Sequence, residues 1–182
     1  MSSKSNQVVI ISAIRTPIGT YKGSLKKMRS DQLGSIVIKE TLKQSKFSKE
    51  EIDEVIMGQV LTAGAGQNPA RQAAINAGIP ISKPAYIVNQ VCGSGLRAVI
   101  SGFQSIKLGE STTIISGGQE NMSIAPHSIF YRDEKKISED KLLDTMVNDG
   151  LIDAFNNYHM GVTAENVAKN LIYQDKNKTN LL

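Results

Sequence analysis

The only cysteine of this 182-residue chain, Cys92, lies in the stretch VNQVCGSGLRAVI, between an apolar run and two glycines. This pattern predicts that Cys92 sits at a turn where a buried strand passes into a helix. In open α/β folds such turns lie at the carboxyl edge of the sheet, where ligands bind. Gly93 and Gly95 let a substrate approach the backbone closely, and the first N–H groups of a helix suit an oxyanion or a thiolate. The context favours a nucleophile, although a lone cysteine in an apolar run is otherwise more often inert packing.

The start of a helix cannot activate this thiol by itself. It contributes about 0.3 to 1 kcal/mol, whereas lowering a pKa by one unit takes about 1.4 kcal/mol. A basic partner is therefore needed, and histidine is the usual one. The chain contains His127 and His159, but neither lies in a motif that identifies a cysteine–histidine pair, and a structural role is the commoner one for an isolated histidine. The residues thus indicate an acyl-accepting cysteine without an identified base.

Two other motifs match the sequence only in part. The nucleophile elbow of α/β-hydrolases, G-x-S-x-G, would require glycines where Cys92 and Leu96 stand. Gly64 and Gly66 begin a G-x-G-x-x-G pattern, but position 69 is proline and no Gly-Lys-Ser/Thr follows. A phosphate-binding loop at this place is the less favoured alternative to a plain loop that leads into a helix.

Strands and helices alternate around Cys92. Apolar, β-branched runs predict strands at 8–13, 54–60, 85–91 and 112–118. Capping residues and helical periodicity predict four helices. Ser30 caps the first, and a short one follows Ser48. The third follows Asn68, with Pro69 as its first residue and Gly78 just past its end, and the fourth covers 96–110. On the helix that Ser30 caps, the side chains expected to face the core are Leu33, Ile36, Val37 and Thr41. On the helix over 96–110 they are Leu96, Val99, Ile100, Phe103 and Ile106. The alternation predicts an α/β layered fold with a mostly parallel sheet, whose first strand, helix and second strand form a βαβ unit.

The amino-acid composition and the periodicity change after Gly118. Residues 119–162 are rich in Asn, Asp, Met and His and show weak periodicity, with short helices expected near 141–147 and 151–155. Thr163 is expected to cap a last helix, after which the chain is polar and unpatterned. We therefore divide the chain into an α/β domain over 1–118, a loop domain over 119–162, and a last helix with a divergent end over 163–182.

Composition narrows the possible function classes. A single cysteine excludes an intrachain disulfide and an all-cysteine metal site, and favours a reducing, cytoplasmic location. No stretch approaches the roughly 20 apolar residues of a membrane span. The formal net charge is +4, but the basic residues are scattered and lack interleaved aromatics. We expect neither nucleic acid nor a membrane as a partner, and no bound metal or cofactor.

The segment VNQVCGSGLRAV resembles the nucleophile segment of the thiolase family, in particular of its acetyl-CoA acetyltransferase type. Five further segments are similar to successive thiolase segments in the same order: SAIRTPIGTYKG, EVIMGQVLTAGAGQNPARQAA, SGGQENMSIAPH, DTMVNDGLIDAF and YHMGVTAENVAK. Together they cover about residues 7–170. The resemblance implies a layered thiolase-like α/β fold, of which this chain holds the N-terminal half and a loop-rich insertion. It also places GAGQNPARQ in scaffold near a subunit interface.

The resemblance also implies a reaction and its residues. Thiolases catalyse the reversible Claisen condensation of two acyl-CoA thioesters, here two acetyl-CoA, in which Cys92 would carry the acyl group and its N–H would help hold the oxyanion. His159 would contact the pantetheine arm, Met160 would back the acyl pocket, and Leu151 would line the coenzyme A site. Coenzyme A thioesters are then substrates rather than cofactors. A homodimer or homotetramer is implied as well.

The chain departs from the family pattern toward its C-terminus. Complete thiolases are longer, and their activating histidine and second cysteine come from a second half with the segments NEAFA, GGAIAIGHP and C-x-G-G-G, which this sequence lacks. We therefore expect a truncated or divergent end and little or no activity of the chain alone. One alternative is a β-ketoacyl synthase, against which the GQNPARQAA and YHMG segments argue. The other is a non-catalytic fragment that associates with thiolase subunits or binds coenzyme A weakly.

Overall fold

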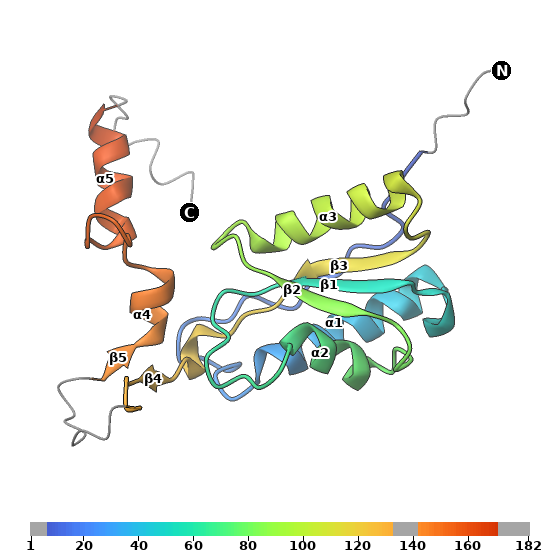
Figure 1. Ribbon diagram of the computed structural model, residues 1–182, viewed down its shortest axis with the longest axis horizontal. Coiled ribbons are helices and arrows are strands. Elements are labelled where there is room, and N and C mark those ends of the chain that lie inside the picture. The colour runs from blue at the N-terminus through green and yellow to red at the C-terminus, as the bar shows by residue number, and fades with distance from the viewer. Residues whose placement is uncertain (1–6, 133–141, 171–182) are drawn as a thin grey trace.

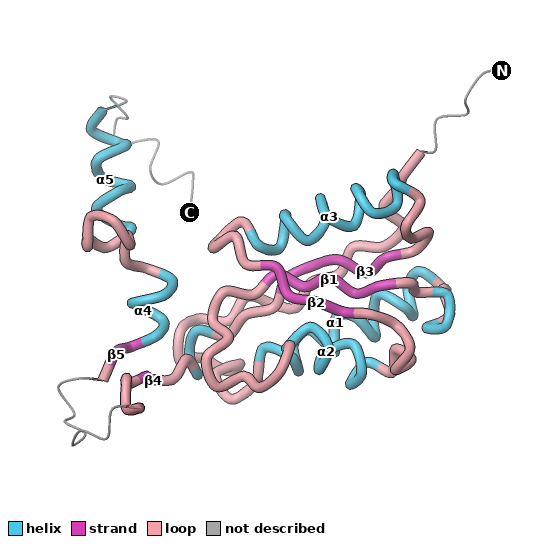
Figure 2. The backbone as a smooth tube through the Cα atoms, in the orientation of Figure 1, coloured by secondary structure: helices cyan, strands magenta, loops and turns pink. Residues whose placement is uncertain are grey.

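A computed structural model describes residues 7–132 and 142–170 of the chain. Its centre is a parallel sheet in the order β2-β1-β3, formed by β1 (Glu54–Gly58), β2 (Ala85–Val88) and β3 (Ile114–Gly118) (Figure 2). Helices α1 (Ser30–Ser45) and α2 (Pro69–Ala77) cover one face of the sheet, and α3 (Ser94–Leu108) covers the other (Figure 1). The predicted α/β layered fold with a parallel sheet is therefore confirmed.

The middle strand, β1, is buried on both of its faces. Val55, Ile56 and Met57 are almost wholly inaccessible to solvent. An unbroken apolar run of this kind is typical of parallel strands that have helices on both sides. The main hydrophobic core joins this strand to α1 and α2 and consists of Ile38, Ile52, Val55, Met57, Ala70, Ala73, Ala74, Ala77, Ile79 and Ile115.

The expected helix ends around the first crossover are confirmed. The Asn68 side chain accepts a hydrogen bond from the Arg71 N–H, and Pro69 is the first residue of α2. Gly78 ends that helix in the left-handed region, with φ +93°, which favours glycine because it has no Cβ. A short 3₁₀ turn, η1 (Lys49–Glu51), carries the expected capping box between Ser48 and Glu51.

The predicted inward face of α1 is partly wrong. Ile36 is 48% exposed, and the buried positions are Ser30, Asp31, Gly34, Ser35 and Ile38. Because α1 packs on α2, small side chains at this interface let the two helices approach closely. The N-cap residue is Arg29 rather than Ser30.

The same correction applies to α3. Its buried residues are Ser94, Ala98 and Gly102, whereas the apolar residues Leu96, Val99, Ile100 and Phe103 are exposed. The cause is the close approach of α3 to the sheet: a Cβ added at Gly102 would come 2.5 Å from Ser116 Oγ. The face of small residues therefore meets the strands, and the apolar stripe does not lie in the core.

The expected first strand at 8–13 is absent from the sheet, and with it the expected βαβ unit. Residues 8–13 belong to no helix or strand, and Val9, Ile10 and Ile11 are exposed. β-branched residues favour a strand only when a neighbouring strand is there to pair with them. A cavity separates this segment from β3, so that pairing is missing.

A short 3₁₀ turn, η2 (Met122–Ile124), follows β3 and is tied to the N-terminal segment, since the Ser123 hydroxyl accepts the Lys22 N–H at 2.8 Å. The described chain after it extends away from the sheet (Figure 1). It comprises the antiparallel pair β4 (His127–Ser128) and β5 (Leu143–Asp144), α4 (Thr145–Gly150) and α5 (Met160–Asn170). A helix near 141–147 is confirmed in part, since α4 begins at Thr145 and residue 141 lies outside the described residues. The expected helix over 151–155 is wrong, because the Asp153 carboxylate accepts the Phe155 and Asn156 N–H groups and closes a turn.

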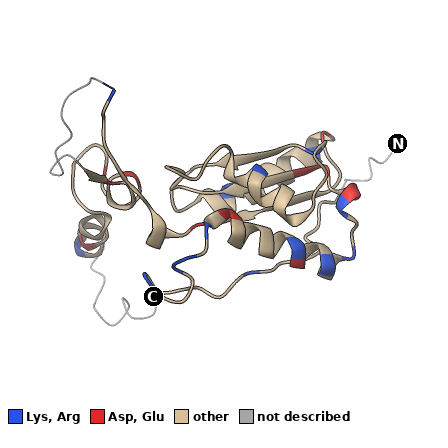
Figure 3. Cartoon of the chain, turned by 90° about the horizontal axis from the view of Figure 1, so that it is seen from below, with Lys and Arg blue, Asp and Glu red and all other residues tan. Residues whose placement is uncertain are grey.

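The last helix begins at Met160, so Thr163 lies inside its first turn and is not its cap. The expected polar end, 171–182, lies outside the described residues. The division at 118 and 162 stays a prediction; residues 119–123 are tied to the sheet body, for example through the Asn121 side chain, which donates to the Leu25 and Met28 carbonyls. Basic and acidic residues are interspersed along the chain in Figure 3. Among the described helices, none has the length and apolar character needed to cross a membrane.

Candidate functional site

Cys92 stands at the predicted strand-to-helix turn. β2 ends at Val88, and α3 begins at Ser94. Two hydrogen bonds shape the turn: the Gly93 N–H donates to the Gln90 carbonyl at 3.1 Å, and the Ser94 N–H donates to the Val91 carbonyl at 3.0 Å. The thiol is exposed to solvent. The turn thus presents the sulfur at the edge of the sheet, as the spacing of the glycines predicts.

Ser94 holds this turn from inside. Its hydroxyl accepts the Gln90 N–H at 2.9 Å and donates to the Val91 carbonyl at 2.5 Å. Ser94 is almost fully buried. Removing its hydroxyl would take away the acceptor of the Gln90 N–H, whereas the Val91 carbonyl would keep the Ser94 N–H as a donor. Ser94 is therefore a positioning residue for Cys92.

The residue before Cys92 has an unusual backbone. Val91 has φ +49°, a region that β-branched residues rarely adopt because of steric clash. Its side chain is 49% exposed, so burial does not explain the strain. Residues held in such conformations are concentrated at functional sites, where the surrounding structure enforces them.

A glycine at the end of β1 lets the turn come close to the sheet. A Cβ added at Gly58 would overlap the Ser94 carbonyl carbon and the Gly95 nitrogen. These are backbone atoms at the start of α3, which cannot move aside as a flexible side chain would. Gly58 therefore allows the start of α3, and with it the Cys92 turn, to pack closely against β1.

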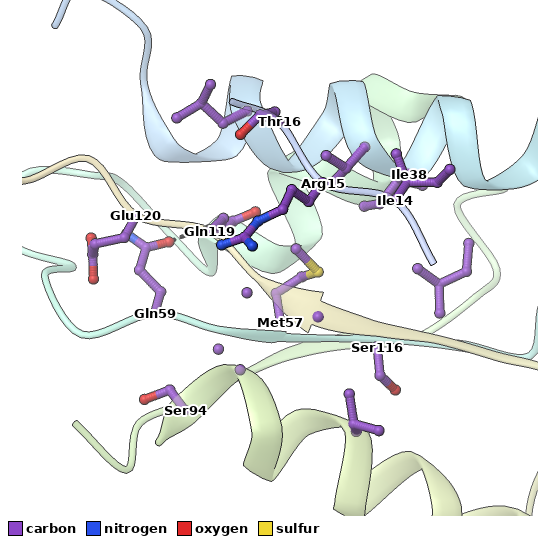
Figure 4. Close-up of a pocket in the computed structure, with 18 of the residues that line it drawn as sticks. Ile14, Arg15, Thr16, Ile38, Met57, Gln59, Ser94, Ser116, Gln119 and Glu120 are labelled. Atoms are coloured by element: carbon purple, nitrogen blue, oxygen red, sulfur yellow. Dashed lines mark hydrogen bonds between the residues drawn. The ribbon is translucent and has the colours of Figure 1, made fainter. Parts of the chain in front are cut away.

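A cavity of about 1250 Å³ opens beside the turn. Cys92 and Leu151 line it, as do parts of α1, β3, α3 and the N-terminal segment. Its wall also contains a polar pair, in which the buried Gln119 side chain donates to Gln59 Oε1 at 2.9 Å (Figure 4). Gln119 Oε1 is buried and has no hydrogen-bond partner among the described residues.

Glu120 joins the two strand ends at this wall. Its carboxylate accepts the N–H groups of Val60 at 2.8 Å and Leu61 at 3.1 Å. Burial raises the pKa of the Glu120 carboxyl above its ordinary value, and the N–H groups of Val60, Leu61 and Asn121 only partly oppose this effect. Keeping the Glu120 carboxyl ionised therefore costs free energy in the folded protein.

The structure groups neither histidine with Cys92. His127 is in β4, opposite Asp144, and His159 precedes α5; neither lines the cavity that Cys92 lines. The exposed His159 accepts the Gly161 N–H at Nδ1, at 3.0 Å. An acceptor Nδ1 places the proton of a neutral ring on Nε2, which can then donate outward.

The three residues implied as a coenzyme A site are only partly brought together. The Met160 N–H donates to the Leu151 carbonyl at 2.8 Å, and Ile152 and His159 form an isolated antiparallel bridge beside it. Of the three, Leu151 shares the cavity with Cys92, whereas His159 and Met160 do not line it.

The glycine-rich loop before α2 is held by side chains. Arg29 donates to the Gln72 side chain at 2.7 Å and to the Ala65 carbonyl at 3.2 Å. Gln72 in turn donates to the Ala65 and Gln67 carbonyls, both at 2.8 Å. This geometry fits a tied scaffold loop. Within residues 7–132 and 142–170, no group of three or more His, Cys, Asp or Glu side chains is placed to hold a metal ion.

Sequence reasoning did not single out Ser94, Gly58 or Val91 as parts of the site. Ser94 carries a signal in the sequence, since a serine at the first turn of a helix beside a nucleophile is placed to bind backbone groups. Gly58 is the last residue of β1, and only the packing of α3 against it shows why a glycine is needed there. No local pattern marks Val91 as strained.

Comparison with known proteins agrees with the resemblance in the sequence. A family model described as "Thiolase, N-terminal domain" matches residues 8–177. The chain is 54% identical over 169 residues to the cytosolic acetyl-CoA acetyltransferase of Rattus norvegicus, covering 93% of this chain and 43% of that protein. It is 55% identical over 163 residues to an acetyl-CoA acetyltransferase of Cupriavidus necator and 52% identical over 163 residues to a probable acetyl-CoA acetyltransferase of Escherichia coli. For both, the match covers 89% of this chain and 42% of the relative.

Proposed function

Because this chain belongs to the thiolase family, we propose that it is the acyl-accepting part of an acetyl-CoA acetyltransferase, with Cys92 as the nucleophile. The chain spans about two fifths of the length of the curated relatives that it matches. The observation that carries the proposal is the turn itself: the only cysteine of the chain is exposed at the end of a strand, beside a cavity and next to a strained residue.

In the proposed first step, the Cys92 thiolate attacks the carbonyl carbon of acetyl-CoA. The new carbon–sulfur bond gives an acetyl-thioester on Cys92, and the bond to the sulfur of coenzyme A breaks, so that coenzyme A leaves as its thiolate. The N–H groups of Gly93 and Ser94 are already bonded to carbonyls of the turn. This leaves the N–H of Cys92 as the proposed donor to the oxyanion, because such a donor must be free to face the developing charge.

In the proposed second step, a second acetyl-CoA loses an α-proton to a base and attacks the acetyl-cysteine. A carbon–carbon bond forms, acetoacetyl-CoA results, and the Cys92 thiolate is released. We propose that Leu151 lines the coenzyme A site, that His159 contacts the pantetheine arm and that Met160 backs the acyl pocket. The cavity position of Leu151 and its hydrogen bond to Met160 support this grouping. The outward Nε2–H of His159 suits a pantetheine carbonyl.

We further propose that these 182 residues on their own turn over very slowly. Within the described residues neither histidine lines the cavity of Cys92, and a nucleophilic thiol needs a base to take its proton. Acylation of Cys92 is then slow, and the proton transfers of the second step lack a group to perform them.

Incubation of the purified chain with acetyl-CoA tests the proposal directly. We expect intact-mass analysis to show the gain of one acetyl group, with the gain lost in Cys92→Ser. The matched control is Ser105→Ala, a change at the far end of α3 that leaves the turn intact, which should acylate as the native chain does. Acylation that persists in Cys92→Ser would refute the assignment of the nucleophile. Rapid cleavage of acetoacetyl-CoA by the chain alone would refute the proposal of slow turnover.

The second candidate is a non-catalytic fragment that associates with thiolase subunits or binds coenzyme A weakly. The absence of both histidines from the lining of the cavity favours it. Binding or co-purification without acetyl gain on Cys92 would support this candidate over the first. A cytoplasmic location is a prediction that the name of the cytosolic relative supports. A dimeric or tetrameric assembly of the intact enzyme is a prediction from the resemblance to the family.

A further inference from the structure

Side chains hold the loop that follows β1. Leu61 in this loop is bonded at both of its backbone groups: its N–H donates to Glu120 Oε2 at 3.1 Å, and its carbonyl accepts from the Gln59 side chain at 2.8 Å. The same Glu120 oxygen accepts the Val60 N–H at 2.8 Å. Because Leu61 is buried, these side chains supply the partners that its backbone groups need.

The side chains that hold this loop form one connected network. The Gln119 side chain donates to Gln59 Oε1 at 2.9 Å, and the Gln119 N–H donates to the Gly58 carbonyl at 2.9 Å. Both glutamines are buried, and Figure 4 shows them beside Glu120. A bond broken in such a buried network is not replaced by a bond to water, so its members keep one arrangement. We call the side chains of Gln59, Gln119 and Glu120 the loop clamp.

Leu61 connects the loop clamp to the segment after α4. Its Cδ2 atom lies 3.7 Å from the place that a Cβ on Gly150 would take, so Leu61 packs beside the last residue of α4. The next residue, Leu151, accepts the Met160 N–H at its carbonyl, at 2.8 Å. Leu61, Leu151 and Cys92 line the same cavity. The position of Leu61 therefore affects where the Leu151–Met160 pair lies relative to the thiol.

A second carboxylate joins the same two strands at their other ends. Asp53, which precedes β1, accepts the N–H groups of Thr112 at 2.7 Å and Thr113 at 3.1 Å. Hydrogen bonds to an ionised group of this kind are stronger than neutral ones. Of the two carboxylates, Glu120 lines the cavity with the thiol and Asp53 does not. Asp53 is therefore a reference for what such a carboxylate contributes to stability alone.

We propose that the loop clamp positions the coenzyme A site: it holds Leu61 so that Leu151 and Met160 lie where acetyl-CoA bound to them reaches the thiol. The inference rests on the proposed function, which takes Leu151 and Met160 as part of that site. Glu120 acts through Leu61, so it is a positioning residue and not a catalytic one.

The first test measures acetyl gain on Cys92 of the full 182-residue chain at increasing acetyl-CoA concentration. We expect Glu120→Ala to raise the half-saturating concentration about fivefold or more and to keep the limiting rate within about twofold, because the clamp positions the substrate and leaves the thiol unchanged. Alkylation of Cys92 by iodoacetamide, which needs no coenzyme A site, should keep its native rate. Glu120→Gln retains an oxygen that accepts the two N–H groups, and it should restore the native half-saturating concentration.

Asp53→Ala is the matched control, since it removes a carboxylate from the other ends of β1 and β3. It should lower stability and leave the half-saturating concentration unchanged. Hydrogen exchange, followed by NMR, gives a second readout that requires no acyl transfer. The amides of Leu61, Leu151 and Met160 should exchange about fivefold faster or more in Glu120→Ala and at the native rate in Asp53→Ala.

Leu61→Val replaces Glu120→Ala if the latter does not fold. It shortens the side chain that packs beside Gly150 and leaves the backbone bonds of the loop clamp in place. The same rise in half-saturating concentration and the same faster exchange at Leu151 and Met160 are expected.

The outcomes distinguish this inference from the proposed function. If the native chain gains no acetyl group but exchange at Leu151 and Met160 is faster in Glu120→Ala, the proposed function is refuted and the positioning by the loop clamp is supported. Native exchange at these amides in Glu120→Ala overturns the inference, whether or not the thiol is acylated. An equal rise in half-saturating concentration in Asp53→Ala also overturns it, because lost stability would then be the cause. Slower alkylation of the thiol in Glu120→Ala would show that the clamp acts on the nucleophile instead, which contradicts the inference as well.

Discussion

At the scale of single residues, the position of Cys92 depends on one hydroxyl. Ser94→Ala removes the group that accepts the Gln90 N–H and donates to the Val91 carbonyl. Each of these two hydrogen bonds contributes a net stabilisation of about 0.5 to 1.5 kcal/mol, so losing both costs about 1 to 3 kcal/mol. We expect a loss of unfolding free energy in this range and slower acylation of Cys92, measured by urea denaturation and by the rate of acetyl gain.

Ser105→Ala provides the control for this change. Its hydroxyl bonds to the Ser111 hydroxyl at 3.2 Å, at the opposite end of α3. The control should leave the acylation rate unchanged. A Ser94→Ala chain that acylates at the native rate would remove Ser94 from the positioning role.

The backbone of Val91 gives a prediction of the opposite sign. A non-glycine residue at positive φ costs about 1 to 3 kcal/mol, and glycine relieves that strain. Glycine also increases the entropy of the unfolded chain, which lowers stability by up to about 1 kcal/mol. We expect Val91→Gly to raise the free energy of unfolding by up to about 2 kcal/mol, measured as a higher urea midpoint with an unchanged slope.

The contrast for Val91 is Val88, at the end of β2. Val88 has no positive φ and is partly buried, so Val88→Gly should lower the midpoint. If both glycine variants lower it, the backbone at Val91 is not under strain.

At the scale of elements, the contact between β1 and α3 fixes the turn. Gly58→Ala would drive a Cβ into the backbone of Ser94 and Gly95. Overpacking of this kind costs about 1 to 3 kcal/mol. We expect a corresponding loss of stability, seen in thermal unfolding, together with slower acylation because α3 must move.

Gly117→Ala is the matched control for the contact between β1 and α3. The Cβ added there would have its nearest neighbours, atoms of Met57, at 4.0 Å, an ordinary contact distance. The control should be nearly neutral. Equal losses in the two variants would show that the effect comes from glycine replacement in strands and not from α3.

Glu120 links the ends of β1 and β3 and makes stability depend on pH. Burial raises the pKa of its carboxyl in the folded state above the unfolded value, so the folded protein binds this proton more readily. The favourable contribution is complete below the unfolded pKa of about 4.3 and is lost as pH rises through the folded pKa. We expect Glu120→Gln to be more stable than the native chain at neutral pH, with the difference shrinking in acid, in denaturation curves from pH 4 to 8. A gain that is the same at every pH would rule out titration as its cause.

The elements show which features could be read from the sequence. The ends of α2 at Asn68 and Gly78, the capping box at Ser48 and the turn at Cys92 were predictable, because each depends on residues within a few positions of one another. The buried faces of α1 and α3 were not predictable. The apolar residues of each helix indicate a different face from the one that carries the small residues Gly34 and Gly102. Close packing of a helix against a neighbour selects small side chains, and this is visible only when the neighbour is known.

At the scale of the whole molecule, the same distinction explains the segment at 8–13. Its composition predicts a strand, but a strand requires a partner that no local pattern can supply. The base for Cys92 is a similar case: the sequence indicated that one is needed, and neither His127 nor His159 lines the cavity with it. The prediction of the nucleophile depended on local residues, whereas completion of the site depends on distant ones.

Two parts of the described chain should differ in their contributions to stability: the sheet body, residues 7–126, and the extension, which holds β4, β5, α4 and α5. Every residue of the main hydrophobic core lies between Ile38 and Ile115, whereas β4, β5, α4 and α5 extend away from it (Figure 1). The ties between the two parts include the bonds of Thr145 to the Pro126 carbonyl and the packing of Gly150 beside the Leu61 side chain. A chain shortened to residues 1–126 should therefore keep a cooperative transition within about 1 kcal/mol of the native free energy of unfolding, because local stability follows buried apolar contacts. The shortened chain lacks Leu151, so its Cys92 should still react with iodoacetamide at the native rate while acetylation by acetyl-CoA slows. Loss of cooperative unfolding on shortening would show that the extension is part of the folding unit and that the core alone does not sustain the sheet.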